Sequence, residues 1–410
     1  RYRQFQRSVC DGLGNIDGRF GTDHHTGCNP VPVSAETSGR RYDSRSCETV
    51  NNKIRETDRL KEKRINIMEL KQIRMGIVGA GTWGATHASI YAEHICADPV
   101  AICDMNKEKA QAIADKYGIR KVYTDYKELA ADPEIDAVAI VTPDFAHADI
   151  ACAMADAGKD ILIEKPLATT REDIDRICEA VERNGVRCMV DLHNRWNAPF
   201  NKAKQEIASG KLGKPYTAYI RHSDVKWVAT DMLSWAAKSS ILWFLGSHSL
   251  DSLRWLVDSE AKRVYSVKRE GLLKERGVDV PDIYLTTIEF ENGVVAQMEN
   301  GWVTPNGNRN VNDFLCDVMC TEGMMKLNLS AHNMIEEITE ESSSVPDVLV
   351  SNMVFDKCKG LSYESIRDFV DRLVDGREFR VTLEDSRKTA IAILAILESA
   401  EKGVPVEIEY

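Results

Sequence analysis

A glycine-rich run, Gly79-Ala80-Gly81-Thr82-Trp83-Gly84, directly follows an apolar stretch at Met75–Val78. Its spacing fits GxGxxG, in which the first glycine permits a tight turn, the second lets a pyrophosphate approach the backbone, and the third lets a helix pack against a strand. Asp104 stands about 20 residues further on, where a carboxylate accepts hydrogen bonds from ribose hydroxyls. The pattern predicts a dinucleotide site that uses Gly79, Gly81, Thr82, Trp83, Gly84 and Asp104. An ordinary strand-to-helix turn is the alternative.

The same carboxylate bears on which dinucleotide would bind. A negative charge at Asp104 repels a 2′-phosphate, so the sequence favours NAD over NADP. Lys107 and Lys109 follow closely and could attract that phosphate, which keeps NADP open. We expect NAD as the cofactor.

Alternating strand and helix patterns must position this loop. Strands are expected at Met75–Val78, Val100–Cys103, Val122–Tyr123, Ala137–Val141, Ile161–Ile163 and Val186–Val190. Helical spacing fills the gaps, with Gly118 and Gly158 at helix ends and Thr170 with Asp173 at a helix start. Because strands and helices alternate through short loops, we predict an α/β fold over residues 68–192, a Rossmann domain with a doubly wound parallel sheet.

The pattern changes beyond Asp191. Further strands are expected at Tyr216–Ile220, Tyr284–Phe290, Val294–Glu299 and Met324–Leu329, with Asn292-Gly293 as a hairpin turn. Helices are expected near Phe200–Ile207, Leu242–Leu256, Tyr363–Leu373 and Leu383–Lys402. This mixture predicts an α+β substrate domain over residues 193–410, built on a largely antiparallel sheet.

Composition limits the class of protein. The chain has 410 residues, of which 43% are hydrophobic and 29% charged, and its formal net charge is −11. These values fit a globular protein of two domains and exclude a collagen-like or fully disordered chain. No apolar run of about 18 residues occurs, so we expect no membrane span. The acidic balance repels phosphate, so we expect no nucleic-acid partner.

The cysteines do not suggest a disulfide framework or a zinc site. The chain has 11 cysteines and no CxxC pair. Cys316 and Cys320 stand four residues apart but have no histidines nearby in the sequence, so we expect no metal. We also recognise no basic-then-apolar signal sequence and therefore expect a cytoplasmic protein. Five cysteines fall in apolar strand or helix patterns, as free thiols do: Cys96, Cys103, Cys152, Cys178 and Cys188.

Residues 1–67 differ from the rest of the chain. They combine glycine, proline, serine and asparagine clusters with arginines, and no apolar periodicity holds through Gly12–Ser38. We expect residues 1–67 to be a disordered or non-native leader, with the regular domain beginning near Met68. The alternative is a metal site built from His24, His25, Cys28 and Cys47, whose spacing matches no common pattern.

Four further motifs follow the glycine run in order: Thr142-Pro143 with His147, Glu164-Lys165-Pro166, Asn194-Arg195-Trp196, and Gly246-Ser247-His248-Ser249-Leu250-Asp251. Together they resemble the glucose–fructose oxidoreductase / inositol dehydrogenase (Gfo/Idh/MocA) family, from about Met68 to the C-terminus. The resemblance implies a Rossmann domain, a sheet-rich substrate domain, and chemistry in the cleft between them. It also implies a homo-oligomer, a dimer or a tetramer.

By this resemblance, Lys165 lies beside the nicotinamide and the reacting hydroxyl. A cation there would polarise the substrate oxygen and stabilise developing alkoxide charge. A surface lysine is the alternative for Lys165, and a catalytic base is the alternative for His147. The residues that would line the cofactor on this side are Thr142, Pro143, His147, Glu164 and Lys165.

His248 matches the family's catalytic histidine, which accepts the hydroxyl proton near neutral pH. A packed helix histidine is the alternative. Family members often carry an aspartate four residues earlier, where this chain has Phe244. Asp251 stands three residues after His248 and could reach it on a helix. Outside candidates for the missing carboxylate are Asp224, Asp231 and Asp282.

Arg195 and Trp235 are expected to contact the substrate, together with Lys165, His248 and Asp251. Aromatic faces stack on the C–H surfaces of sugar rings, and Trp235 stands in an irregular stretch before the His248 helix. Core packing explains the other tryptophans of this half at least as well: Trp227, Trp243 and Trp302.

We therefore expect an NAD-dependent oxidoreductase that acts on a small-molecule substrate, at a secondary hydroxyl of a sugar, glycoside or cyclitol. One alternative keeps NAD tightly bound and recycles it in a redox-neutral epimerisation or glycoside elimination. The other alternative is a non-enzymatic regulator that senses a sugar or a dinucleotide. Release of NADH would distinguish the NAD-dependent oxidoreductase from the redox-neutral alternative.

Overall fold

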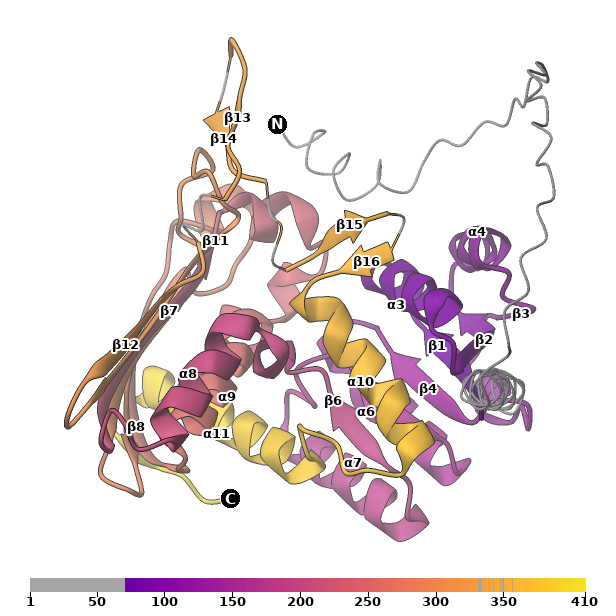
Figure 1. The fold of residues 1–410 in the computed structure, drawn as a ribbon, viewed down its shortest axis with the longest axis horizontal. Helices are drawn as coiled ribbons and strands as arrows, with labels where there is room; N and C mark the ends of the chain where they lie inside the picture. The colour runs from indigo at the N-terminus through magenta and orange to yellow at the C-terminus, as the bar shows by residue number, and fades with distance from the viewer. Residues whose placement is uncertain (1–70, 331–333, 342, 347, 349, 356) are drawn as a thin grey trace, which may run out of the picture. The chain divides into compact units, whose positions relative to one another are not determined.

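The structure is a computed structural model that describes residues 71–330, 334–341, 343–346, 348, 350–355 and 357–410 (Figure 1). Residues Gln72–Tyr410 form one compact unit. The expected leader at 1–67, including His24, His25, Cys28 and Cys47, lies outside the described residues.

Six parallel strands form the first sheet, in the order β3-β2-β1-β4-β5-β6. This order confirms the predicted doubly wound sheet, because the strands progress outward in both directions from β1. The central strands are buried on both faces, as expected of a sheet covered by helices. The strands are β1 (Ile73–Val78), β2 (Ala97–Cys103), β3 (Lys121–Tyr123), β4 (Ala137–Ile140), β5 (Asp160–Ile163) and β6 (Cys188–Val190).

The helices of this part begin and end at the expected residues. The Thr170 side chain accepts a hydrogen bond from the Asp173 amide, and Gly118 adopts the left-handed conformation that ends a helix. The helices are α3 (Thr82–Glu93), α4 (Lys107–Tyr117), α5 (Tyr126–Ala130), α6 (His147–Asp156) and α7 (Arg171–Asn184), with a short 3₁₀ turn η3 (Asp144–Ala146).

Seven strands form the second sheet, in the order β12-β11-β7-β10-β9-β8-β17. All neighbours pair antiparallel except β10 with β7, so the predicted largely antiparallel sheet is confirmed. The strands are β7 (Pro215–Asp224), β8 (Ala261–Arg269), β9 (Ile283–Phe290), β10 (Val295–Gly301), β11 (Asn312–Cys320), β12 (Met324–Asn328) and β17 (Val406–Glu407). Two small hairpins pair β13 (Glu337–Ile338) with β14 (Ser343–Ser344), and β15 (Asn352–Val354) with β16 (Lys357–Lys359).

Helices α8 (Ala198–Ala208), α9 (Ser247–Val257) and α11 (Leu383–Lys402) lie between the two sheets (Figure 1). Helix α10 (Leu361–Asp375) packs against α3 and β1, so the chain returns to the Rossmann sheet after building the second sheet. The short turns here are η4 (His193–Trp196), η5 (Val228–Met232), η6 (Ala236–Lys238), η7 (Leu242–Gly246) and η8 (Lys274–Arg276).

One expected helix differs in detail. The stretch Leu242–Leu256 begins as a π-helical turn, η7, and the regular helix α9 starts at Ser247. The spacing of apolar residues does not distinguish a π-helical turn from an α-helical one, so the sequence could not predict the change. Among the described residues, no helix is both long enough and apolar enough to span a bilayer.

Candidate active site

The glycine-rich loop joins β1 to α3, and two of its glycines are required by close packing. Gly79 has φ +113°, and a Cβ there would lie 2.5 Å from the Val141 carbonyl oxygen. A Cβ on Gly84 would lie 2.0 Å from the Gly79 carbonyl oxygen. A Cβ on Gly81, in contrast, would meet no described atom within 4 Å. The loop is therefore tightly packed at its ends and open at Gly81, where a phosphate can approach the start of α3.

Asp104 follows β2 and is held beside this loop. Its Oδ2 accepts a hydrogen bond of 2.7 Å from the Ala80 amide, and its Oδ1 accepts one of 2.8 Å from the Asn106 amide. Thr82 and Trp83 are exposed at the first turn of α3. The glycine-rich loop, the end of β2 and the first turn of α3 thus bring together the residues predicted to bind the dinucleotide.

The loop after β4 carries Thr142, Pro143 and His147. Thr142 Oγ1 is buried and lacks a hydrogen-bond partner in the described part of the chain, so it is a free donor at this edge of the sheet. His147 is fully buried; its Nδ1 lies 2.8 Å from the Pro166 carbonyl oxygen and its Nε2 lies 3.1 Å from the Thr142 carbonyl oxygen. Burial lowers the pKa of His147 and so favours the neutral ring, whose single N–H can donate to one of these two carbonyl oxygens at a time. The contact of His147 with the cofactor stays a prediction.

Lys165 follows β5 and reaches the second domain. Its Nζ donates a 2.7 Å hydrogen bond to the Phe244 carbonyl oxygen and lies 4.1 Å from the centre of the Phe244 ring. Burial lowers the pKa of Lys165, while nearby carboxylates, Glu164 foremost, oppose that shift. Lys165 Nζ thus lies where β5 of the Rossmann domain meets the second domain.

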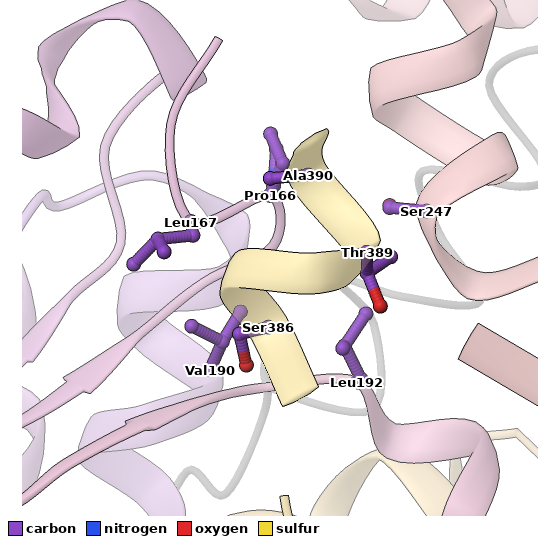
Figure 2. A pocket seen from close by; sticks show the side chains of 8 residues that line it. All are labelled: Pro166, Leu167, Val190, Leu192, Ser247, Ser386, Thr389 and Ala390. Atoms are coloured by element: carbon purple, nitrogen blue, oxygen red, sulfur yellow. The ribbon is translucent and has the colours of Figure 1, made fainter. Parts of the chain in front are cut away.

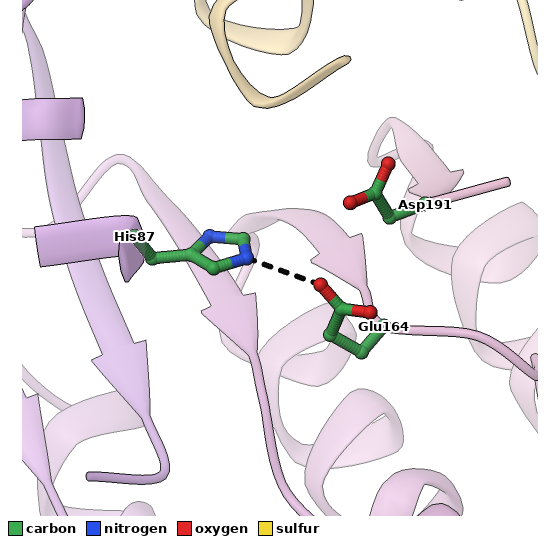
Figure 3. Close-up of side chains that lie close together, drawn as sticks. All are labelled: His87, Glu164 and Asp191. Carbon is green, nitrogen blue, oxygen red and sulfur yellow. Dashed lines mark hydrogen bonds and ion pairs between the residues drawn. The ribbon is translucent and has the colours of Figure 1, made fainter. Parts of the chain in front are cut away.

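Three buried polar side chains lie close together near the carboxyl ends of β5 and β6 (Figure 3). His87 Nε2, on α3, lies 3.2 Å from Glu164 Oε1, and His87 Nδ1 lies 3.0 Å from the Tyr91 hydroxyl. Asp191, directly after β6, is fully buried. Donor atoms of His87, Glu164 and Asp191 all lie within 4.8 Å of one another, a spacing that suits either a metal centre or a hydrogen-bonded cluster. Because His87 and Glu164 already bind each other, we assign these two residues to a hydrogen-bonded pair, beside which Asp191 has no hydrogen-bond partner among the described residues.

Three histidines come together on the substrate side of Lys165. The ring of His248, on α9, lies 4.3 Å from the ring of His193, on η4. His222, on β7, stacks on Phe314 with the ring centres 3.9 Å apart. Burial lowers the pKa of His222 to about 3 and holds the pKa of His248 well below its usual value; nearby cationic groups, including Lys165, act in the same direction. The sequence identified only His248; the position of His193 beside the Asn194-Arg195-Trp196 motif was the available signal for the second.

Asp224 ends β7 and is a buried carboxyl near these groups. Burial raises its pKa to about 7, although the charge of Lys165 acts in the opposite direction. It accepts a hydrogen bond from the Asn312 side chain. Of the outside candidates, Asp224 is therefore in the site, whereas Asp231 is exposed and Asp282 accepts hydrogen bonds from the Leu272 and Leu273 amides.

Arg195 and Asp251 bind each other, and the contact of either residue with substrate stays a prediction. Arg195 Nη2 lies 2.6 Å from Asp251 Oδ1, and Arg195 Nε lies 3.0 Å from Asp251 Oδ2. The arginine also reaches Asp385. Although burial opposes its charge, Asp251 holds the pKa of Arg195 above its usual value. His248 Nδ1 has no hydrogen-bond partner among the described residues, so Asp251 does not orient His248 through this nitrogen.

Aromatic rings continue outward from Lys165. Trp235 is half-buried and meets Phe244 edge-on, with ring centres 6.2 Å apart, and Phe244 lies 6.0 Å from Trp302. Trp302 and Trp243 are buried in the core. Of these three tryptophans, only Trp235 is partly exposed, and its contact with substrate stays a prediction.

A small cavity lies beside this site rather than in it (Figure 2). Neither Lys165 nor His248 lines it, and its wall is mostly apolar, so it is a packing gap between the Pro166 turn and α11. The lining residues are Pro166, Leu167, Val190, Leu192, Ser247, Ser386, Thr389 and Ala390.

Comparison with known proteins agrees with this geometry. Residues 73–192 match the family described as "Oxidoreductase family, NAD-binding Rossmann fold", and residues 200–326 match the GFO/IDH/MocA C-terminal domain. Inositol 2-dehydrogenase of Salmonella typhimurium is 30% identical over 81% of this chain and 95% of its own length.

Two solved structures share the fold. Scyllo-inositol dehydrogenase from Lactobacillus casei, with bound NAD(H) and scyllo-inositol, has a TM-score of 0.70 and 20% identity over 82% of this chain and 99% of its own. Levoglucosan dehydrogenase in complex with NADH has a TM-score of 0.71 and 25% identity over 83% of this chain and 100% of its own. The chain belongs to the Gfo/Idh/MocA family and is a nicotinamide-dinucleotide-dependent dehydrogenase.

Proposed function

We propose that this dehydrogenase uses NAD to interconvert a secondary hydroxyl and a ketone on a cyclitol, sugar or glycoside. The observation that carries the proposal is the position of Lys165 at the carboxyl end of β5, joined to Phe244 of the second domain and close to a cluster of histidines. The names of the relatives, an inositol 2-dehydrogenase and a levoglucosan dehydrogenase, support cyclic polyols as the substrate class.

The residues fit a dinucleotide. Gly81 leaves the backbone open to a pyrophosphate, and the unpartnered Thr142 hydroxyl is a donor at the same sheet edge. Thr82, Trp83 and Pro143 complete the cofactor side. Asp104 would receive the ribose hydroxyls and would repel a 2′-phosphate, which supports NAD over NADP.

The chain's own groups handle the hydroxyl. A bound nicotinamide supplies the acceptor for the hydrogen that leaves carbon. Lys165, while charged, polarises the substrate oxygen and stabilises the negative charge that develops there. The proton goes to an imidazole of the pair His193 and His248, whose rings lie 4.3 Å apart. Trp235 offers an aromatic face to the C–H surface of the ring.

A panel of myo-inositol, scyllo-inositol and levoglucosan tests the proposal, each offered with NAD and with NADP. We expect reduced nicotinamide to accumulate with NAD and with at least one compound. Conversion of a compound without release of NADH would favour the redox-neutral alternative. Binding of the compounds with no conversion at all would favour a sensor.

We further propose a homo-oligomer formed through the outer face of the second sheet. Helices α8, α9 and α11 lie on its other face, and apolar side chains that are 39–47% exposed run across this one. They lie on adjacent strands in register, Val267 opposite Leu285 and Met319 opposite Met324. Exposed apolar side chains gathered on one sheet face are typical of a protein interface, and this supports the proposal. The side chains are Tyr265, Val267, Leu285, Val295, Met319 and Met324.

Sedimentation distinguishes this interface from a monomer. Leu285→Glu should lower the mass of the particle, whereas Val404→Glu, at an equally exposed apolar residue off the sheet face, should not.

We place the enzyme in the cytoplasm, where free thiols persist, because all eight cysteines among the described residues are free.

A further inference from the structure

The site contains a carboxylate and an imidazole whose roles the proposed function leaves open. Asp191 is fully buried, and neither of its oxygens lies within hydrogen-bonding distance of a donor among the described residues. Although burial acts to raise its pKa, two side chains close to it, His193 and Ser365, lower that pKa, and the Ser365 hydroxyl donates to the Ser362 carbonyl oxygen. His193 Nδ1 is also buried without a partner and lies 3.8 Å from Asp191 Oδ2. Because an unpaired buried carboxylate is costly, the two atoms are strongly favoured to close to hydrogen-bonding distance.

The other side of His193 faces the centre of the site. Its ring lies 6.4 Å from the ring of Trp83, on the glycine-rich loop, and 4.3 Å from the ring of His248, on the substrate domain. Nδ1 faces Asp191, and no hydrogen bond within the described chain engages Nε2. His193 thus stands between the cofactor loop and the second domain with one nitrogen free for a ligand.

The neighbouring carboxylates are committed elsewhere. Asp251 binds Arg195 through both oxygens, and Glu164 binds His87. Asp144 accepts hydrogen bonds from the Ser239 hydroxyl and the Phe145 amide, and Asp224 accepts one from the Asn312 side chain. His248, in contrast, has a buried Nδ1 without an acceptor, because Phe244 stands where a carboxylate would support it. Asp191 is therefore the carboxylate placed to support an imidazole here, and that imidazole is His193.

We propose that Asp191 and His193 form the acid–base pair of this active site, with His193 Nε2 accepting the substrate's hydroxyl proton. The inference rests on the proposed function and names the base within it. The O–H bond breaks as an N–H bond forms at Nε2, and the C–H electron pair leaves with hydrogen to the nicotinamide of bound NAD. Asp191 holds the tautomer with the proton on Nδ1 and stabilises the imidazolium, as a buried aspartate does in other acid–base pairs. His248 then remains a neutral hydrogen-bonding partner of the substrate.

The first test needs no substrate. In the full chain carrying isotope-labelled histidine, the Nδ1–H of His193 should give a downfield proton resonance, protected from exchange by Asp191. His193→Gln identifies the resonance by its loss, and Asp191→Asn should shift it upfield or remove it. The same resonance, unmoved in Asp191→Asn, would show that the pair does not exist.

The second test measures turnover with NAD and myo-inositol, or with the best compound of the panel. His193→Gln should lower kcat by about 10²–10⁴, the usual contribution of a positioned base, while the Kd for NAD changes by less than about threefold. His193→Gly should regain activity when imidazole is added to the solution. The matched control His248→Gln should lose clearly less kcat than His193→Gln. Melting temperatures confirm that each variant is folded.

The outcomes separate the two proposals. A larger loss of kcat in His248→Gln than in His193→Gln, with no rescue of His193→Gly, would return the base to His248 and overturn the inference. A native chain that converts no compound would contradict the proposed function instead, and the imidazole resonance would still decide whether Asp191 and His193 are paired.

Discussion

Lys165 Nζ donates a hydrogen bond to the backbone carbonyl of Phe244 and also lies over the ring of the same residue, 4.1 Å from its centre. One side chain of the Rossmann domain is thus positioned by both the backbone and the aromatic ring of the substrate domain. The apolar ring adds no countercharge, and burial lowers the pKa of Lys165.

Replacing Phe244 with aspartate should move the alkaline limb of the pH–rate profile. Activity needs the charged form of Lys165, so it falls as pH rises through the lowered pKa. A carboxylate in Phe244→Asp favours the charged ammonium, raises that pKa, and moves the limb to higher pH. Phe244→Asn is the uncharged control. An equal shift in both variants, or no shift in either, would show that charge at this position does not act on Lys165.

The glycine-rich loop gives a matched pair of variants. Gly81→Ala adds a methyl group where no described atom lies within 4 Å, so the melting temperature should hold while the Kd for NAD rises at least tenfold. Gly84→Ala places its methyl 2.0 Å from the Gly79 carbonyl oxygen and should destabilise the fold itself. Thermal melting and NAD titration distinguish the two effects. Normal NAD binding by Gly81→Ala would remove Gly81 from the pyrophosphate site.

The sequence predicted the parts of the fold that depend on local patterns. The six strands of the Rossmann sheet, four strands of the second sheet, the glycine positions and the cap at Thr170 follow from short-range periodicity and backbone geometry. Strands β8, β11 and β17 of the second sheet were not predicted. Contacts between distant segments could not be predicted in this way. Neither the pairing of Arg195 with Asp251 nor the approach of Asp191 to His193 has a local signature, because each depends on where η4 lies relative to its neighbours. The spacing on one helix suggested that Asp251 could reach His248, whereas its partner, Arg195, lies on another element.

Cofactor preference should respond to two residues after β2. Asp104→Ser together with Met105→Arg replaces a repulsive carboxylate with a cation, so binding of NAD should weaken and binding of NADP should improve. Met105 is 95% exposed, so its replacement should not disturb the core. Kd values for both dinucleotides measure the change. A native chain that already prefers NADP would contradict the role given to Asp104.

Asp224 should make stability depend on pH. Its carboxyl has a pKa of about 7 in the folded chain, whereas an unfolded aspartate ionises near pH 3.9. Between these values the folded chain holds a proton that the unfolded chain releases, so stability falls as pH rises from about 4 to about 7, by up to about 1.4 kcal/mol per pH unit.

Urea unfolding of the native chain and of Asp224→Asn across this range measures the effect. The asparagine amide does not ionise in this pH range, so the native chain should lose stability relative to the variant as pH rises. Parallel stability curves for the two proteins would mean that Asp224 is already ionised in the folded state.

The most direct measurement of the central claim is the rate at which reduced nicotinamide appears with NAD and each of the three cyclic polyols, for the native chain and for Lys165→Met. Methionine keeps much of the volume of lysine and removes its charge. The account predicts NADH from the native chain with at least one compound, and a rate lower by about 10²–10³ in Lys165→Met, with NAD affinity nearly unchanged. No NADH from the native chain with any compound, or an equal rate in Lys165→Met, would contradict it.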